Sequence, residues 1–177
     1  MNDLIKITEG DLDVILDLKY FSKDNITNDF IYDKEYNFLH KDAIKNLKEA
    51  IKLANDYGYK FKIFDAYRPV KYQKHLYDKF PGDYVSNPQT GAVPHCRGVA
   101  IDLTLIDQGG NELDMGTKFD DFSTKAHHGA KNISIQAQKN RLILLSIMIS
   151  SNWDFYNKEW WHYQLFNTKD YNIIYDY

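Results

Sequence analysis

The sequence feature that most constrains the fold is an apolar run from Gly98 to Ile106 that carries one carboxylate in its middle. Its Val, Ile, Leu and Thr residues predict a central β-strand. Asp102 interrupts this run, and a buried carboxylate needs a partner to offset the loss of its hydration. We therefore expect Asp102 to meet such a partner inside the domain.

The periodicity of apolar residues on either side of this run predicts both helices and strands. From Asp42 to Tyr57 they recur at three- and four-residue steps, and Gly58 follows where a left-handed C-terminal cap is expected. Further helices are expected from Pro69 to about Phe80 and from Ser134 to Ser150, the latter lying across the sheet with little exposure. The expected strands cover residues 14–19, 61–64, 98–106, 153–156 and 160–166. We expect one α+β domain over residues 1–177, with helices packed on a mostly antiparallel sheet.

Composition and charge exclude several classes of partner. Hydrophobic residues make up 44% and charged residues 27% of the chain, the balance of a soluble globular protein. The net charge is −3 without a Lys/Arg block, so no nucleic-acid partner is expected. The longest apolar run, Leu142 to Ile149, is too short to span a membrane. Cys96 is the only cysteine and the N-terminus lacks a secretory layout, which predicts a cytoplasmic protein, whereas the oligomeric state is left open.

Two histidines stand near carboxylates at spacings that suggest a common site. His95 precedes Asp102 by seven positions across a loop-to-strand passage, so both side chains can converge above the sheet. Glu159 precedes His162 by three positions, and residues three apart in a regular strand face opposite sides. Glu159 must therefore lie in the turn before the strand, or the strand must bulge, for both to reach one site.

Two imidazoles and a carboxylate are a common catalytic zinc set that leaves the fourth position for water. Bound zinc lowers the pKa of that water to about 7. Glu159 is the candidate to take and return a proton, and Arg68, on a strand-end turn, the candidate to stabilise an oxyanion. Each residue also has an ordinary interpretation: His95 as a surface or capping residue, and Arg68 as the partner of Asp65. From the residues alone, the prediction is a metal hydrolase without the helical His-Glu-x-x-His signature.

Longer motifs carry a family resemblance. The run His95-x-x-Gly98-x-Ala100-x-Asp102 resembles the zinc motif of the D-alanyl-D-alanine dipeptidases, a family associated with vancomycin resistance and related to the wider D,D-peptidase/Hedgehog-like superfamily. Matching segments occur in order along nearly the whole chain: Tyr20 with Asp24–Thr27, Asp65–Pro69, Met115–Asp120 followed by His127 and His128, and Glu159–Tyr163.

The resemblance implies a role for each candidate residue. One zinc ion is expected on His95, Asp102 and His162, with Glu159 as the catalytic base and acid. Arg68 is expected to stabilise the tetrahedral intermediate, and Asp120 and Tyr20 to receive the substrate's free amino group. The implied reaction is hydrolysis of the D-alanyl-D-alanine dipeptide in a Hedgehog/D,D-peptidase-like fold.

Three alternatives remain beside this prediction. A D,D-carboxypeptidase or peptidoglycan endopeptidase of the wider superfamily uses the same ligands on longer cell-wall peptides, although the motifs at 115–120 and 159–163 favour a dipeptidase. A non-catalytic zinc-bearing binding module would not need Glu159 and Arg68. A structural zinc site would need a fourth ligand, for which Cys96 is the candidate; we interpret Cys96 as a bystander. Val93 and Pro94 replace the small hydroxyl residues usual before the first histidine, so contacts to the peptide are expected to differ there.

Overall fold

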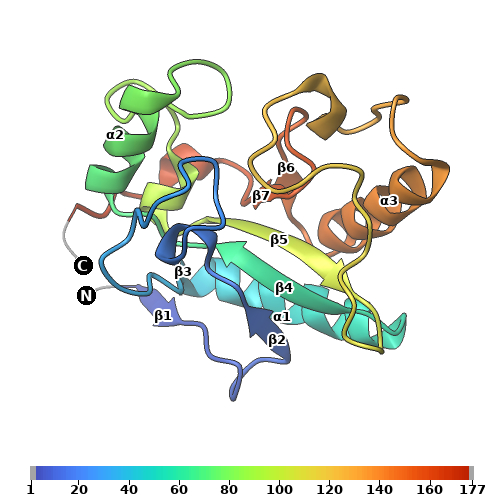
Figure 1. Cartoon of the computed structure of the whole chain (residues 1–177). Coiled ribbons are helices and arrows are strands. Elements are labelled where there is room, and N and C mark those ends of the chain that lie inside the picture. The colour runs from blue at the N-terminus through green and yellow to red at the C-terminus, as the bar shows by residue number, and fades with distance from the viewer. Residues whose placement is uncertain (1–2, 176–177) are drawn as a thin grey trace.

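A five-stranded sheet organises the chain in the computed structural model, which describes residues 3–175 (Figure 1). The strand order is β2 (Val14–Leu16), β4 (Lys60–Asp65), β5 (Ala100–Ile106), β7 (His162–Gln164) and β6 (Asp154–Phe155). Strands β2 and β4 are parallel, and the other neighbours are antiparallel. The expected α+β fold with a mostly antiparallel sheet is therefore confirmed. A separate antiparallel pair, β1 (Leu4–Lys6) with β3 (Phe38–His40), was not among the expected strands.

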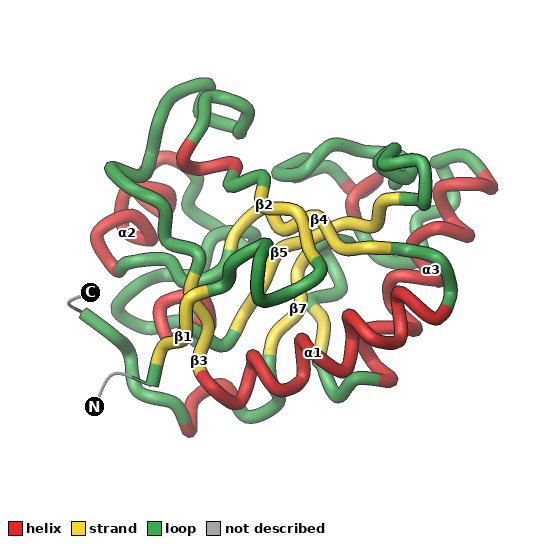
Figure 2. Tube along the Cα trace, turned by 90° about the horizontal axis from the view of Figure 1, so that it is seen from below, coloured by secondary structure: helices red, strands yellow, loops and turns green. Residues whose placement is uncertain are grey.

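Two long helices, α1 (Lys41–Asp56) and α3 (Ile135–Ser150), lie side by side against one face of the sheet (Figure 2). The side chain of His40 caps α1 by accepting from the backbone N–H of Asp42, and Ser134 caps α3 in the same way. Gly58, with φ at 79°, ends the first helix in the left-handed conformation that its position predicts. The shorter α2 (Val70–Lys79) and the 3-10 turns η1 (Lys19–Phe21), η2 (Pro94–Arg97), η3 (Thr124–Ala126) and η4 (Thr168–Asp170) complete the elements.

Strand β5 is buried along its whole length, as its sequence predicts. Ile101, Leu103 and Leu105 belong to the main hydrophobic core together with residues of α1 and α3. Because successive strand residues face opposite sides of a sheet, Asp102 lies on the face turned away from this core. A second cluster on that side is rich in aromatic residues and joins the N-terminal segment to α2: Tyr20, Tyr32, Tyr36, Tyr67, Leu76 and Val85.

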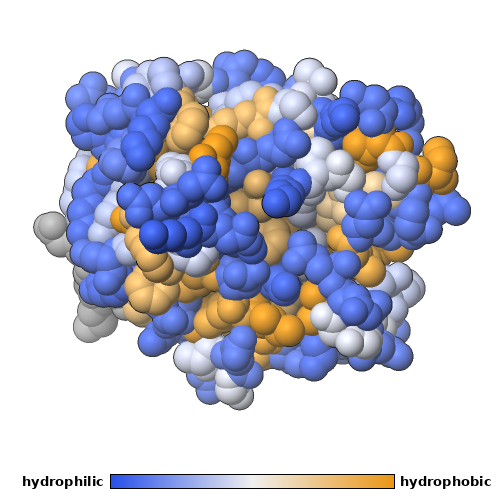
Figure 3. All heavy atoms as spheres, in the orientation of Figure 1, coloured by the Kyte–Doolittle hydropathy of each residue, from blue (hydrophilic) through white to orange (hydrophobic). Residues whose placement is uncertain are grey.

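Three expectations about the elements were wrong in detail. Strand β2 ends at Leu16, because the chain then turns into η1, which carries Tyr20. Strand β7 begins only at His162, because residues 159–161 form a turn. Helix α3 is not largely covered: Ile135, Leu142 and Ile149 are exposed, since it packs on the core through its opposite side. Hydrophobic atoms show at the α3 edge of the face in Figure 3, and also below the centre of that face.

Within residues 3–175, no helix has the length and apolar character needed to cross a bilayer.

Candidate active site

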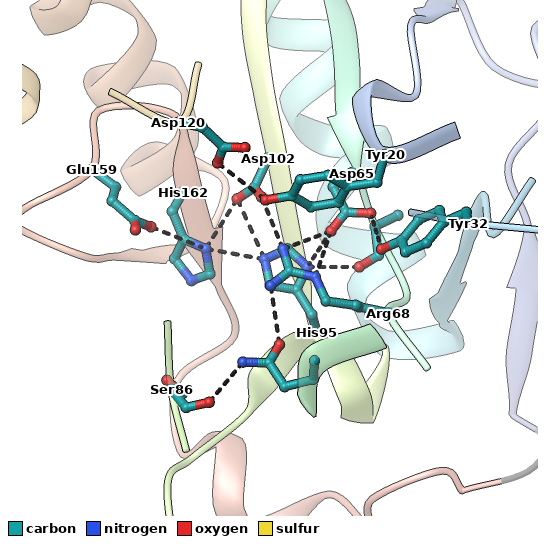
Figure 4. Close-up of polar contacts among 12 residues, drawn as sticks. Tyr20, Tyr32, Asp65, Arg68, Ser86, His95, Asp102, Asp120, Glu159 and His162 are labelled. Atoms are coloured by element: carbon teal, nitrogen blue, oxygen red, sulfur yellow. Dashed lines mark hydrogen bonds and ion pairs between the residues drawn. The ribbon is translucent and has the colours of Figure 1, made fainter. Parts of the chain in front are cut away.

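Three polar residues of the candidate site stand in a row across three adjacent strands. Asp102 on β5 pairs directly with His162 on β7, and on its other side with Asp65 at the end of β4. A register shift between Ile63 and Asp65 precedes the second pairing. Directly opposed residues in an antiparallel pair share one face of the sheet, so the three side chains are brought together by strand register (Figure 4).

His95 reaches the same point from η2. Its Nδ1 atom lies 2.6 Å from the carbonyl oxygen of Ala66. A carbonyl only accepts hydrogen bonds, so Nδ1 carries the proton and the lone pair of the neutral ring is on Nε2. That Nε2 atom lies 3.2 Å from Nδ1 of His162 and 3.4 Å from Oδ1 of Asp102.

The second histidine is oriented in a comparable way. Nε2 of His162 lies 3.1 Å from the amide oxygen of Gln164, which leaves Nδ1 facing Asp102 at 3.0 Å. The three facing atoms thus form a triangle with sides of 3.0, 3.2 and 3.4 Å. Two ligands of a tetrahedral zinc ion stand about 3.3 Å apart. His95, Asp102 and His162, all buried, therefore fit a metal ion with the donor set that zinc prefers.

The electrostatics of this group favour a charged carboxylate. Burial opposes the charge on Asp102, but His95 and the hydrogen bond with His162 hold its pKa well below the usual range. Burial likewise opposes the charge on His162, yet Asp102 raises the pKa of that ring above its ordinary value. A carboxylate that stays ionised although it is only 2% exposed suits the binding of a cation.

Glu159 lies in the turn that precedes β7, one of the two positions that its spacing from His162 allowed. The turn is closed by a hydrogen bond from the Glu159 backbone N–H to the Tyr156 carbonyl at 3.1 Å. The residue is 7% exposed, and its Oε2 atom lies 3.9 Å from Nδ1 of His162. Burial raises the pKa of Glu159 to about 8, the range in which a carboxyl group can exchange protons at neutral pH.

Arg68 and Asp65 form a buried pair beside the metal-binding group. The Nε and Nη2 atoms of Arg68 both donate to Oδ2 of Asp65, at 3.0 and 2.7 Å, and Nη2 lies 3.6 Å from Oδ2 of Asp102. The structure therefore pairs Arg68 with Asp65, as its ordinary interpretation has it, and also places Arg68 beside Asp102. Asp65 was not predicted as a site residue, although its place three residues before Arg68 at a strand end was a usable signal.

Asp120 and Tyr20 form a second buried pair at the candidate site. The Tyr20 hydroxyl donates to Oδ1 of Asp120 at 3.0 Å, and Oδ2 is buried without a hydrogen-bond partner among the described residues. Burial, partly offset by Arg68, raises the pKa of Asp120 to about 7. Asp120 also has φ at 59°, an uncommon conformation for a residue other than glycine. The site thus holds one carboxylate oxygen free to accept from a ligand.

These groups surround a cavity of about 230 Å³. It is lined by all seven predicted residues, His95, Asp102, His162, Glu159, Arg68, Asp120 and Tyr20, as well as by Val93 and Pro94. Val93 is buried and has φ at 43°, so a β-branched residue is held in the left-handed region next to His95. Cys96 does not line the cavity; burial raises the pKa of its thiol to about 12, which disfavours the thiolate that metals bind.

Gln73 is a residue of the site that the sequence analysis did not predict. It is 3% exposed, lines the cavity and accepts a hydrogen bond from Arg68. Nothing in the local sequence distinguishes this residue from an ordinary polar residue of a short helix.

Comparison with known proteins gives consistent results. A family model described as D-ala-D-ala dipeptidase, of peptidase family M15, matches residues 1–176. The D-alanyl-D-alanine dipeptidase of Escherichia coli K12 is 40% identical over 165 residues, covering 93% of this chain and 85% of that protein. The enzyme of the same name from Enterococcus faecium is 31% identical over 186 residues, covering 91% of this chain and 90% of that protein.

A solved structure of the LdcB LD-carboxypeptidase, which reveals the molecular basis of peptidoglycan recognition, has a similar fold. It matches with a TM-score of 0.55 at 17% identity, covering 96% of this chain and 71% of that one. At this identity the likeness shows the fold alone.

Proposed function

This chain belongs to the D-Ala-D-Ala dipeptidase family of peptidases, and from that membership we propose that it hydrolyses the D-alanyl-D-alanine dipeptide with one zinc ion. The observation that carries the proposal is the triangle of His95, Asp102 and His162, with Glu159 facing the same cavity. A zinc ion held there would supply a water whose pKa is lowered to about 7 and would polarise the substrate carbonyl.

Glu159 is the residue proposed to move protons. It lies beside His162 but is not part of the three-residue metal-binding group. Its carboxylate takes the proton of the attacking water and passes it to the amine that leaves when the peptide bond breaks. The burial that raises its pKa also favours the protonated form needed for the second of these transfers.

Arg68 is proposed to stabilise the oxyanion, and Asp120 is proposed to bind the free ammonium group of the substrate. The guanidinium of Arg68 is held at the cavity wall by Asp65, so it can stabilise an oxyanion without reorganising. Oδ2 of Asp120 accepts from the ammonium group of the substrate, while Tyr20 holds the other oxygen. An anchor for the free amino group lets the enzyme measure its substrate from the N-terminus.

The size of the cavity supports a very small substrate. Its volume of about 230 Å³ is below the roughly 300–1,000 Å³ of pockets that hold drug-sized ligands. A D,D-carboxypeptidase acting on longer cell-wall peptides is the alternative that this observation disfavours.

A cleavage assay on D-Ala-D-Ala, L-Ala-L-Ala and a cell-wall pentapeptide, with metal content measured on the same sample, tests the proposal. We expect release of D-alanine from the D,D-dipeptide only, by protein that holds one zinc ion per chain. Cleavage of the pentapeptide at a comparable kcat/KM would establish the carboxypeptidase instead. Bound zinc without turnover on any substrate would indicate a binding module.

A further inference from the structure

We propose that Gln73 is a positioning residue for the reaction, because it holds the guanidinium of Arg68 and connects it to a segment that lines the cavity. This segment, Asp83 to Ser86, lines the cavity and is called the strap below. The inference rests on the proposed function, in which Arg68 stabilises the oxyanion.

The two hydrogen bonds of Gln73 fix its amide in one orientation. Nη1 of Arg68 donates to Oε1 of Gln73 at 3.0 Å, and Nε2 of Gln73 donates to the backbone carbonyl of Ser86 at 2.8 Å. A guanidinium only donates and a carbonyl only accepts, so a flipped amide would lose both bonds. Gln73 is therefore a rigid connector between the catalytic arginine and the strap.

Gln73 also completes the restraint of the guanidinium. Arg68 has five N–H donors. Two of them go to Oδ2 of Asp65 and one to Gln73, and Nη2 also lies 3.6 Å from Oδ2 of Asp102. Asp65 alone restrains one edge of the group, and the bond to Gln73 fixes its other end. Without Gln73 the guanidinium can tilt about the Asp65 edge and leave its place in the cavity wall.

The strap is anchored at its other end to the segment that carries the catalytic base. Asp83 forms an ion pair with Lys158, and its backbone carbonyl accepts from the Tyr156 hydroxyl at 2.8 Å. The ring of Tyr84 stacks on Phe122 with centroids 4.7 Å apart. Gln73 and the strap thus connect Arg68 to the turn of Glu159 around the cavity, so the two catalytic groups are positioned by one continuous set of contacts.

The variant Q73M tests this role, since it preserves the approximate length and apolar volume of the side chain but removes both hydrogen bonds. We expect kcat/KM for D-Ala-D-Ala to fall roughly 10- to 100-fold, as a misplaced catalytic group does. The affinity for a phosphinate analogue of the dipeptide, which mimics the tetrahedral oxyanion, should fall by the same factor. The KM for the substrate and the zinc content should change little, which separates positioning from a structural role.

The matched control is Q138M, which also removes a side-chain hydrogen bond to a backbone carbonyl, at 3.2 Å, but lies on α3 away from the cavity. It should leave both constants unchanged. If Q73M does not fold, Q73N replaces it, because the shorter amide cannot span Arg68 and Ser86. Unchanged kcat/KM and phosphinate affinity in a folded Q73 variant would overturn the proposal.

A crystal structure of the Q73 variant separates this proposal from the proposed function. If wild-type protein cleaves no D,D-dipeptide, the proposed function fails, but the position of the guanidinium still tests Gln73. We expect Arg68 to tilt away from the position it has beside Asp102 while it keeps its bonds to Asp65. An unmoved guanidinium would refute the positioning role whatever the substrate.

Discussion

Asp102 and His162 are direct cross-strand partners, and Oδ1 of the first lies 3.0 Å from Nδ1 of the second. Because the pairing of β5 with β7 sets this distance, two of the three candidate metal ligands are positioned by backbone hydrogen bonding rather than by a loop. His95 is positioned separately, by the bond from its ring to the carbonyl of Ala66. The metal-binding geometry is therefore expected to be formed before a metal binds.

A preformed site predicts a clear response to metal removal and to loss of the carboxylate. A chelator should abolish peptidase activity and lower the melting temperature, and added zinc should restore both. A ligand present at 100 times its Kd stabilises a fold by about 2.7 kcal/mol. D102N should fold, since the amide keeps the shape of the side chain, but should bind zinc weakly and show no thermal shift on its addition. Calorimetry and metal analysis test this; a D102N variant that holds stoichiometric zinc would contradict the ligand assignment.

The variant E159Q separates catalysis from metal binding. Glu159 lies outside the metal-binding triangle, so its amide should leave one zinc ion per chain. Loss of a general base typically costs about 10²–10⁴ in rate, and kcat should fall in this range while KM changes little. Stopped-time assays on D-Ala-D-Ala with metal analysis provide the measurement. Turnover at the wild-type rate would remove Glu159 from the mechanism.

The sequence predicts the chemistry of this site better than its surroundings, for a physical reason. Asp102 is recognisable because a carboxylate in an apolar strand is costly, and His162 because it follows the carboxylate Glu159 at a spacing that requires a turn or a bulge for both to reach one site. Both inferences depend on local sequence alone. Strand pairing and buried hydrogen bonds join residues that are far apart in the chain, and a single sequence does not show which residues meet.

Gln73 and the exposed stripe on α3 illustrate this limit. Gln73 matters only because Arg68 and Ser86, five and thirteen residues away, come to its two ends. The apolar pattern of α3 predicted burial, yet Leu142 is 61% exposed, because composition alone does not tell which sides of a helix find a partner. The roles of the individual site residues remain predictions, whereas the family and the fold class are confirmed.

The raised pKa of Asp120 predicts how kcat/KM changes on the acidic side of its pH profile. Its ionised form accepts from the substrate's ammonium group, and Glu159 must be ionised to act as the base, so kcat/KM should rise with pH through pKa values of about 7 and about 8. Above about pH 8 it should fall again, as the amino group of the substrate loses its proton. In Y20F the carboxylate loses a donor that favours its charged form, so the acidic limb should move up by about one pH unit.

The control for Y20F is Y36F, since Tyr36 donates to Asp33 outside the cavity. Its acidic limb should coincide with that of the wild type. Coincident limbs in Y20F and the wild type would show that Asp120 does not control the profile.

The lowered pKa of His128 predicts that the stability of the fold depends on pH, independently of catalysis. Burial and, to a lesser extent, Arg141 lower the pKa of His128 to about 4, while its interaction with the Glu159 backbone opposes this shift. The unfolded chain has a histidine pKa of about 6.5. Between these values the unfolded state binds more protons, so the stability that the neutral ring contributes is present above pH 6.5 and is lost as the pH falls towards 4.

Urea unfolding of wild-type protein and H128Q across this pH window measures the effect. The wild type should lose on the order of 2 kcal/mol relative to H128Q between pH 7 and pH 4. A chelator keeps metal binding out of the comparison. The raised pKa values of Asp120 and Glu159 act in the opposite direction, since these groups bind more protons in the folded state, but they are shared by both proteins and cancel in the difference. Parallel stability curves for the two proteins would show that His128 titrates normally in the folded state.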